Sequence, residues 1–136
     1  MSDVIRHIPF EGSPERQHFE FLRLGEFRLQ NCTDCGRAIF YPRSLCPHCG
    51  STALEWRKSN GRGEVYSVTV VRQAETAGGD YNVALINLED GVRLMSRVVG
   101  TANDDIHIGL KVTADILPAE EGDPLLVFRA QEIGHD

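Results

Sequence analysis

The sequence has no cysteine outside one short segment, and all four cysteines lie between residues 32 and 49. Disulfide scaffolds usually spread their cysteines through a secreted chain, so this clustering favours a metal site over disulfides. No apolar run approaches the roughly 20 residues of a membrane helix. The N-terminal stretch MSDVIRHIPFEG has no apolar segment of the kind that a secretion signal needs. We therefore expect a cytoplasmic protein without a membrane partner.

Basic residues are also in short supply. The chain has 14 lysine and arginine residues against 20 aspartate and glutamate residues, which gives a net charge of −6 over 136 residues. A chain of this charge repels phosphate backbones unless its basic residues cluster. The densest basic stretch is Arg57-Lys58, with Arg62 nearby. We therefore expect no nucleic-acid partner.

Recognisable motifs for a catalytic nucleophile are missing as well. The sequence contains no Gly-x-Ser-x-Gly turn, and Ser67 and Ser96 fall within predicted strands. Ordinary strand polarity accounts for both serines. We predict no catalytic residue and expect no activity from the chain alone.

The cysteines that are present form two pairs. Cys32 and Cys35 are followed, after ten residues, by Cys46 and Cys49, and each pair precedes a glycine. Zinc in structural sites prefers four such ligands in a tetrahedron and needs no open position. The spacing therefore predicts a structural zinc site, with iron in a rubredoxin-like site as the alternative. His48 lies inside the second pair, and we expect it to be exposed rather than a ligand.

A short helix is predicted over residues 13–25. Ser13 is suited to cap it, Pro14 to occupy its first position, and Gly25 to end it. A helix of about three turns is marginal alone, so it must dock on this chain or on a partner. Its large apolar residues offer more surface than we expect a small ribbon to cover; they are Phe19, Phe21, Leu22 and Leu24.

The rest of the chain is predicted to form short strands. We divide the whole chain into an N-terminal helical arm (1–25), a zinc ribbon (26–58) and an all-β domain (59–136). Five strands are predicted in the last part, at residues 64–72, 81–88, 92–99, 111–117 and 124–130. Residues 101–110 break the pattern with a short helical turn. A small barrel of the OB type fits this pattern, and a five-stranded sandwich fits it as well.

One predicted strand places two arginines on the same face. Arg93 and Arg97 alternate with Met95 between them, and Arg72 ends an earlier predicted strand that we expect nearby. Such a face is suited to bind the phosphates of a nucleotide-like ligand. A solvent-facing strand without a ligand is the alternative interpretation.

Three stretches together resemble a known family. They are LQNCTDCGRAIFYPRSLCPHCGS, then LEWRKSNGRGEVYSVTVV, then Ile108-Gly109-Leu110-Lys111-Val112. From about residue 15 to 131 the chain is similar to the zinc-ribbon plus OB-fold proteins associated with acyl-CoA enzymes. The resemblance implies a mainly β protein with an N-terminal helical arm, a rubredoxin-like ribbon and a five-stranded OB barrel. It transfers the four cysteines as ligands of structural Zn²⁺.

The resemblance also implies a function. Relatives act as non-catalytic subunits beside thiolase-fold enzymes, such as thiolases, acyltransferases or aldolases that cleave CoA thioesters. A CoA thioester shared with the partner enzyme follows from this, and Arg93 and Arg97 are the candidates to bind its phosphates. The alternative is a nucleic-acid-binding module, because ribbons and OB barrels both serve that role, but the net charge argues against it.

Overall fold

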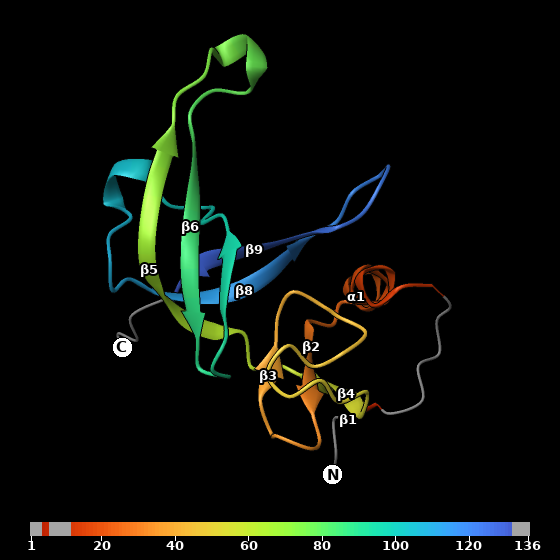
Figure 1. The fold of residues 1–136 in the computed structure, drawn as a ribbon. Coiled ribbons are helices and arrows are strands. Elements are labelled where there is room, and N and C mark those ends of the chain that lie inside the picture. The colour runs from red at the N-terminus through yellow and green to blue at the C-terminus, as the bar shows by residue number, and fades with distance from the viewer. Residues whose placement is uncertain (1–3, 6–11, 132–136) are drawn as a thin grey trace. The chain divides into compact units, whose positions relative to one another are not determined.

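The computed structural model describes residues 4–5 and 12–131, which form two compact units (Figure 1). The ribbon unit comprises the described residues up to Asn60, together with Asp90–Val92 and Ile116–Leu126. The barrel unit comprises Gly61–Glu89, Arg93–Asp115 and the described residues from Val127 onward. Most of the stretch behind our expectation of no secretion signal lies outside the described residues. The domain limits 1–25, 26–58 and 59–136 stay predictions.

The helix begins and ends where its signals predict. Helix α1 spans Pro14–Arg23, and the hydroxyl of Ser13 caps it by accepting a hydrogen bond from the amide of Arg16 at 3.2 Å. After the helix, Gly25 adopts a φ of 81°, which lets the chain turn back. Among the described residues, neither α1 nor any other helix has the length and apolar character needed to cross a membrane.

The apolar face of α1 is covered by the chain itself. Phe21 and Leu22 are 1% and 2% exposed, and the ring of Phe21 packs at 5.2 Å from that of Trp56 in the ribbon sheet. Our expectation that the ribbon leaves this surface free is therefore wrong for its central residues. Leu24, at 63% exposed, stays in solvent.

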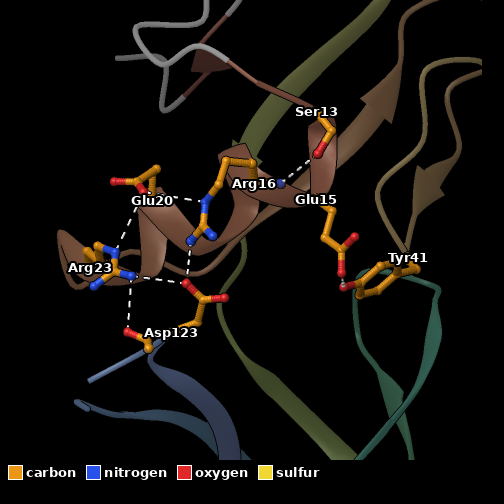
Figure 2. Close-up of polar contacts among 8 residues, drawn as sticks. Ser13, Glu15, Arg16, Glu20, Arg23, Tyr41 and Asp123 are labelled. Atoms are coloured by element: carbon orange, nitrogen blue, oxygen red, sulfur yellow. Dashed lines mark hydrogen bonds and ion pairs between the residues drawn. The ribbon is translucent and has the colours of Figure 1, made fainter. Parts of the chain in front are cut away.

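Polar contacts fix α1 to the segment 118–124, which lies between strand β8 (Lys111–Leu117) and strand β9 (Leu125–Ala130) (Figure 2). The guanidinium groups of Arg16 and Arg23 both donate to the carboxylate of Asp123, and Arg23 also donates to the backbone oxygen of Gly122 at 3.1 Å. Glu20 forms ion pairs with the same two arginines at 3.5 and 3.6 Å. The hydrogen bond from Arg16 and the nearby positive charges lower the pKa of Asp123, which keeps it ionised.

The ribbon sheet has four strands in the order β1-β4-β2-β3. Strand β2 (Arg28–Cys32) pairs antiparallel with β4 (Leu54–Lys58) and with β3 (Ala38–Ile39). These strands frame the two cysteine pairs. Strand β1 (Val4–Ile5) pairs with the outer edge of β4 and was not predicted, because two residues carry no readable alternation.

The barrel sheet has five strands in the order β7-β6-β5-β8-β9. Figure 1 shows the two longest, β5 (Arg62–Val71) and β6 (Tyr81–Leu88), side by side. Strand β8 (Lys111–Leu117) has its predicted limits, and β9 (Leu125–Ala130) starts one residue later than predicted. A helical turn at Asn103–Asp105 fills the predicted break between the third and fourth strands, and a second one, Glu75–Ala77, lies in the predicted loop.

The sheet closes on itself, which decides between barrel and sandwich. Strand β7 (Arg93–Ser96) ends three residues earlier than predicted because the chain then turns to β9. Val98 forms a parallel bridge with Phe128, whose amide donates to the oxygen of Arg97 at 2.9 Å. The predicted OB-type barrel is therefore confirmed, and its interior is filled by apolar side chains such as Val65, Ile86 and Phe128.

Helix α1 carries a buried histidine, His18. His18 is 3% exposed and lies among aromatic rings, with centroids of Phe19, Phe40 and Tyr41 at 5.1, 5.5 and 6.4 Å. Its Nδ1 atom has no hydrogen-bond partner within residues 12–131. Burial lowers the pKa of His18 to about 4, while the nearby carboxylate of Glu15 acts weakly in the other direction. The imidazole is therefore neutral at physiological pH.

Replacing His18 by phenylalanine should reduce the acid sensitivity of the protein. Between pH 6.5 and about 4 the unfolded chain binds a proton at His18 that the folded chain does not, so the free energy of unfolding falls as pH drops. The fall amounts to at most about 3 kcal/mol. Urea unfolding of wild type and His18→Phe at several pH values measures it. Equal pH slopes in the two proteins contradict the prediction, and the exposed His107→Gln is the control.

The Asp123→Asn substitution should loosen α1 without unfolding the barrel. It removes the charge that holds both helix arginines, so amide hydrogen exchange in α1 should accelerate. The matched control is Asp115→Asn, which removes an acceptor of Arg129 in the barrel unit. Unchanged exchange in α1, or equal acceleration in the control, would show that Asp123 does not anchor the helix.

Candidate functional site

The first cysteine pair sits in a tight turn at the end of β2. The amide of Cys35 donates to the sulfur of Cys32 at 3.4 Å, and the amide of Gly36 donates to the backbone oxygen of Cys32 at 2.8 Å. Gly36 adopts a φ of 78°, which an ordinary residue avoids. The turn therefore directs backbone dipoles at the sulfur and depends on its glycine.

The second pair repeats this turn almost identically. The amide of His48 donates to the sulfur of Cys46 at 3.4 Å, and the amide of Gly50 donates to the oxygen of Cys46 at 2.8 Å. Gly50 has a φ of 79°. The two turns thus form matching knuckles, which explains why a glycine follows each cysteine pair.

The four sulfurs converge on one point. All lie within 4.8 Å of one another, and two pairs, Cys32–Cys49 and Cys35–Cys46, are 3.6 Å apart. A tetrahedron of four sulfurs bound to zinc at about 2.3 Å has edges of about 3.8 Å. The donor set and its spacing therefore fit a closed four-thiolate metal centre.

The four thiols lie close enough to influence one another's ionisation. Burial raises the pKa of Cys46, but hydrogen bonds from the amides of His48 and Cys49 outweigh this effect, and the pKa is lowered to about 7. The amide of Ser51 lowers the pKa of Cys49, but the Cys32 thiol and burial raise it to about 12. One thiolate therefore disfavours the next, as expected for acids that share a site. A divalent cation removes this conflict and releases protons on binding.

Buried polar contacts hold the second knuckle in place. The side-chain amide of Gln30, 4% exposed, donates to the oxygen of Arg43 at 2.7 Å and accepts from the amide of Arg43 at 2.6 Å. The hydroxyl of Ser51 donates to Asp34 and so joins the two knuckles. Our sequence reasoning missed these residues. The alternation of this segment puts Gln30 on the side opposite Phe27 and Leu29, so its burial carries no local signal.

His48 is exposed and lies outside the sulfur cluster, as we expected. Its Nδ1 atom lies 3.2 Å from the guanidinium of Arg37. Within the described residues, the group that converges as metal donors consists of the four cysteines.

The second predicted site lies on the barrel. Arg93 and Arg97 are exposed on the same face, separated by the exposed Met95. A strand rise of about 3.3 Å per residue puts their Cα atoms about 13 Å apart. The two side chains therefore contact two separate anionic groups more readily than one. Their assignment to CoA phosphates stays a prediction.

Family models match the chain in two adjoining parts. Residues 19–55 match the ChsH2 rubredoxin-like zinc ribbon domain, and residues 56–117 match the ChsH2 C-terminal OB-fold domain. Both matches agree with the predicted ribbon and barrel. The chain thus contains a zinc ribbon whose four thiols support a structural Zn²⁺ site.

Curated relatives agree with this match. A probable enoyl-CoA hydratase alpha subunit of Thermomonospora curvata is 36% identical over 82% of this chain and 35% of its own length. A DUF35 domain-containing scaffold protein of Pyrococcus furiosus is 30% identical over 76% of both chains. The chain thus spans about a third of the first relative, and it spans 62% and 64% of two other archaeal scaffold proteins.

A solved structure described as the Ltp2-ChsH2(DUF35) aldolase contains a chain of the same fold. It is 34% identical, with a TM-score of 0.77 over 90% of this chain and 98% of that one. The paired cysteines, the closed barrel and these likenesses confirm the resemblance inferred from the sequence: the chain belongs to the DUF35 family, with a ChsH2-type zinc ribbon followed by an OB-fold domain.

Proposed function

We propose that this chain is an accessory subunit that supports an enzyme acting on acyl-CoA thioesters. The observation that carries the proposal is the likeness to a chain of the Ltp2-ChsH2(DUF35) aldolase structure, which covers 90% of this chain and 98% of that one. Three archaeal relatives named as scaffold proteins support the same role. The reaction itself is assigned to the partner enzyme.

Zinc has a structural role in this proposal. Cys32, Cys35, Cys46 and Cys49 hold one Zn²⁺, which supplies charge neutralisation and cross-links the two knuckles. Four thiolates fill the tetrahedron, so no position remains for a water or a substrate oxygen. The amides of Cys35 and His48 orient and stabilise the sulfurs through their hydrogen bonds.

A thiolase-fold enzyme is the first candidate partner, and it rests on the family resemblance of the sequence. The curated relative from Thermomonospora curvata favours a second candidate, because its name places a related region in an enoyl-CoA hydratase subunit. Both enzyme classes handle CoA thioesters. The two candidates are distinguished by testing which of the two enzymes the chain binds.

Purified protein should contain one zinc ion per chain, and Cys35→Ser should lose it. Metal binding of this kind stabilises a small site by on the order of 10 kcal/mol, so the ribbon unit should lose its fold. Elemental analysis gives the metal content, and hydrogen exchange compares the ribbon and barrel units. The exposed Ser44→Ala, also in the ribbon unit, is the control. Substoichiometric metal under reducing, zinc-replete conditions, with four free thiols, would contradict the assignment.

Co-expression with a thiolase-fold enzyme from the same organism should yield a stable complex in size-exclusion chromatography. The chain alone should show no thiolase or aldolase turnover, and it should raise the activity or stability of the enzyme. An enoyl-CoA hydratase subunit, tested in parallel, examines the second candidate. If the chain co-elutes with neither enzyme and changes neither turnover, the accessory role is wrong.

A further inference from the structure

The outer face of strands β5, β6 and β7 carries an unusual group of side chains. Met95 stands at its centre, 69% exposed, opposite Leu85 on the neighbouring strand. Tyr66, 46% exposed, and the half-buried Tyr81 flank this centre. We name this surface the Arg–Tyr face and define it by the following residues: Tyr66, Tyr81, Leu85, Arg93, Met95 and Arg97.

Both arginines of the Arg–Tyr face are stacked on a tyrosine. The guanidinium of Arg93 lies 3.6 Å from the ring centroid of Tyr66, and that of Arg97 lies 4.6 Å from the centroid of Tyr81. Arg93 also donates from Nε to the side-chain oxygen of Asn87 at 2.7 Å. These contacts restrict both side chains while both residues stay exposed, so less entropy remains to be lost when they bind.

Neither arginine is neutralised. Within residues 4–5 and 12–131, Arg93 and Arg97 form no ion pair with a carboxylate, whereas several other arginines of the chain do; these are Arg16, Arg23, Arg28, Arg57, Arg72 and Arg129. In a chain with a net charge of −6, Arg93 and Arg97 place two such cations on one face of the barrel unit. The face therefore offers local positive charge to an acidic partner.

We propose that the Arg–Tyr face is the surface by which the barrel unit docks on the partner enzyme, and that it recognises an acidic patch there. The patch carries an apolar side chain that covers Met95, between two carboxylates that accept from Arg93 and Arg97. This inference rests on the accessory role proposed above. Tyrosine, arginine and methionine at the centre of a patch are the residue types enriched at protein interfaces.

The geometry favours a protein over a phosphate ligand. A phosphate site gathers its donors around one point, but here the two guanidinium groups stand on either side of the apolar Met95 and Leu85. A nucleic-acid strand needs aromatic faces on which bases stack. One face of each tyrosine is already covered by a guanidinium. Phosphate ligands, including coenzyme A and oligonucleotides, are therefore outcomes for the test.

The experiment uses full-length variants and the enzyme subunit that co-elutes with the wild-type chain. The double substitution Arg93→Ala/Arg97→Ala should raise the dissociation constant at least tenfold and flatten the dependence of the association rate on salt. Met95→Asp should weaken binding to a similar extent. The matched controls are Arg129→Ala on the same barrel and Ile108→Asp. Ile108 is 71% exposed and lies in a turn outside the Arg–Tyr face. Circular dichroism and zinc content verify the fold of each variant.

Each result decides the inference. Loss of affinity in the Arg–Tyr variants, with both controls binding normally, supports it. Wild-type affinity in both Arg–Tyr variants overturns it while the accessory role stands. Coenzyme A or a single-stranded oligonucleotide that binds the isolated chain through Arg93 and Arg97, with unchanged affinity for the enzyme, also overturns it. A wild-type chain that binds neither candidate enzyme removes the accessory role and this inference with it.

Discussion

Four cysteine sulfurs within 4.8 Å of one another set the constraint on which the ribbon unit depends. The apolar cluster beside them is small and consists of Cys32, Ile39 and Cys46, with Leu54 against it. A core of this size contributes little to folding, so the knuckles need a cross-link. Both knuckle turns, the glycines behind them and the Gln30 contact serve to bring the sulfurs to this distance.

Local signals in the sequence were sufficient for most of the fold. Ser13, Pro14 and Gly25 predicted the helix to within about one residue at each end, because capping depends on residues adjacent in the chain. Alternation predicted β6 and β8 with their observed limits. The cysteine pairs predicted the metal centre for the same reason: ligand spacing within a turn is a local property.

Contacts between distant segments could not be predicted in this way. Arg16 and Asp123 are 107 residues apart, and no pattern in either segment indicates that they meet. The burial of Phe21 and Leu22 was missed because amphipathicity shows that a helix docks but not on what. The stacking of Arg93 on Tyr66 depends likewise on how β7 and β5 both pair with β6. The alternation of the sequence predicted that Arg93 and Arg97 share one face, but their stacking on tyrosines is seen only in the structure.

The ribbon unit is discontinuous in the chain, since Ile116–Leu126 belongs to it although the barrel strands β5 to β7 precede that segment. This segment contributes Asp123, whose carboxylate forms ion pairs with Arg16 and Arg23 of the helix. A gene break after Asn60 would therefore separate the helix from its anchor. Recombination at that boundary would transfer a ribbon without the carboxylate that holds its helix.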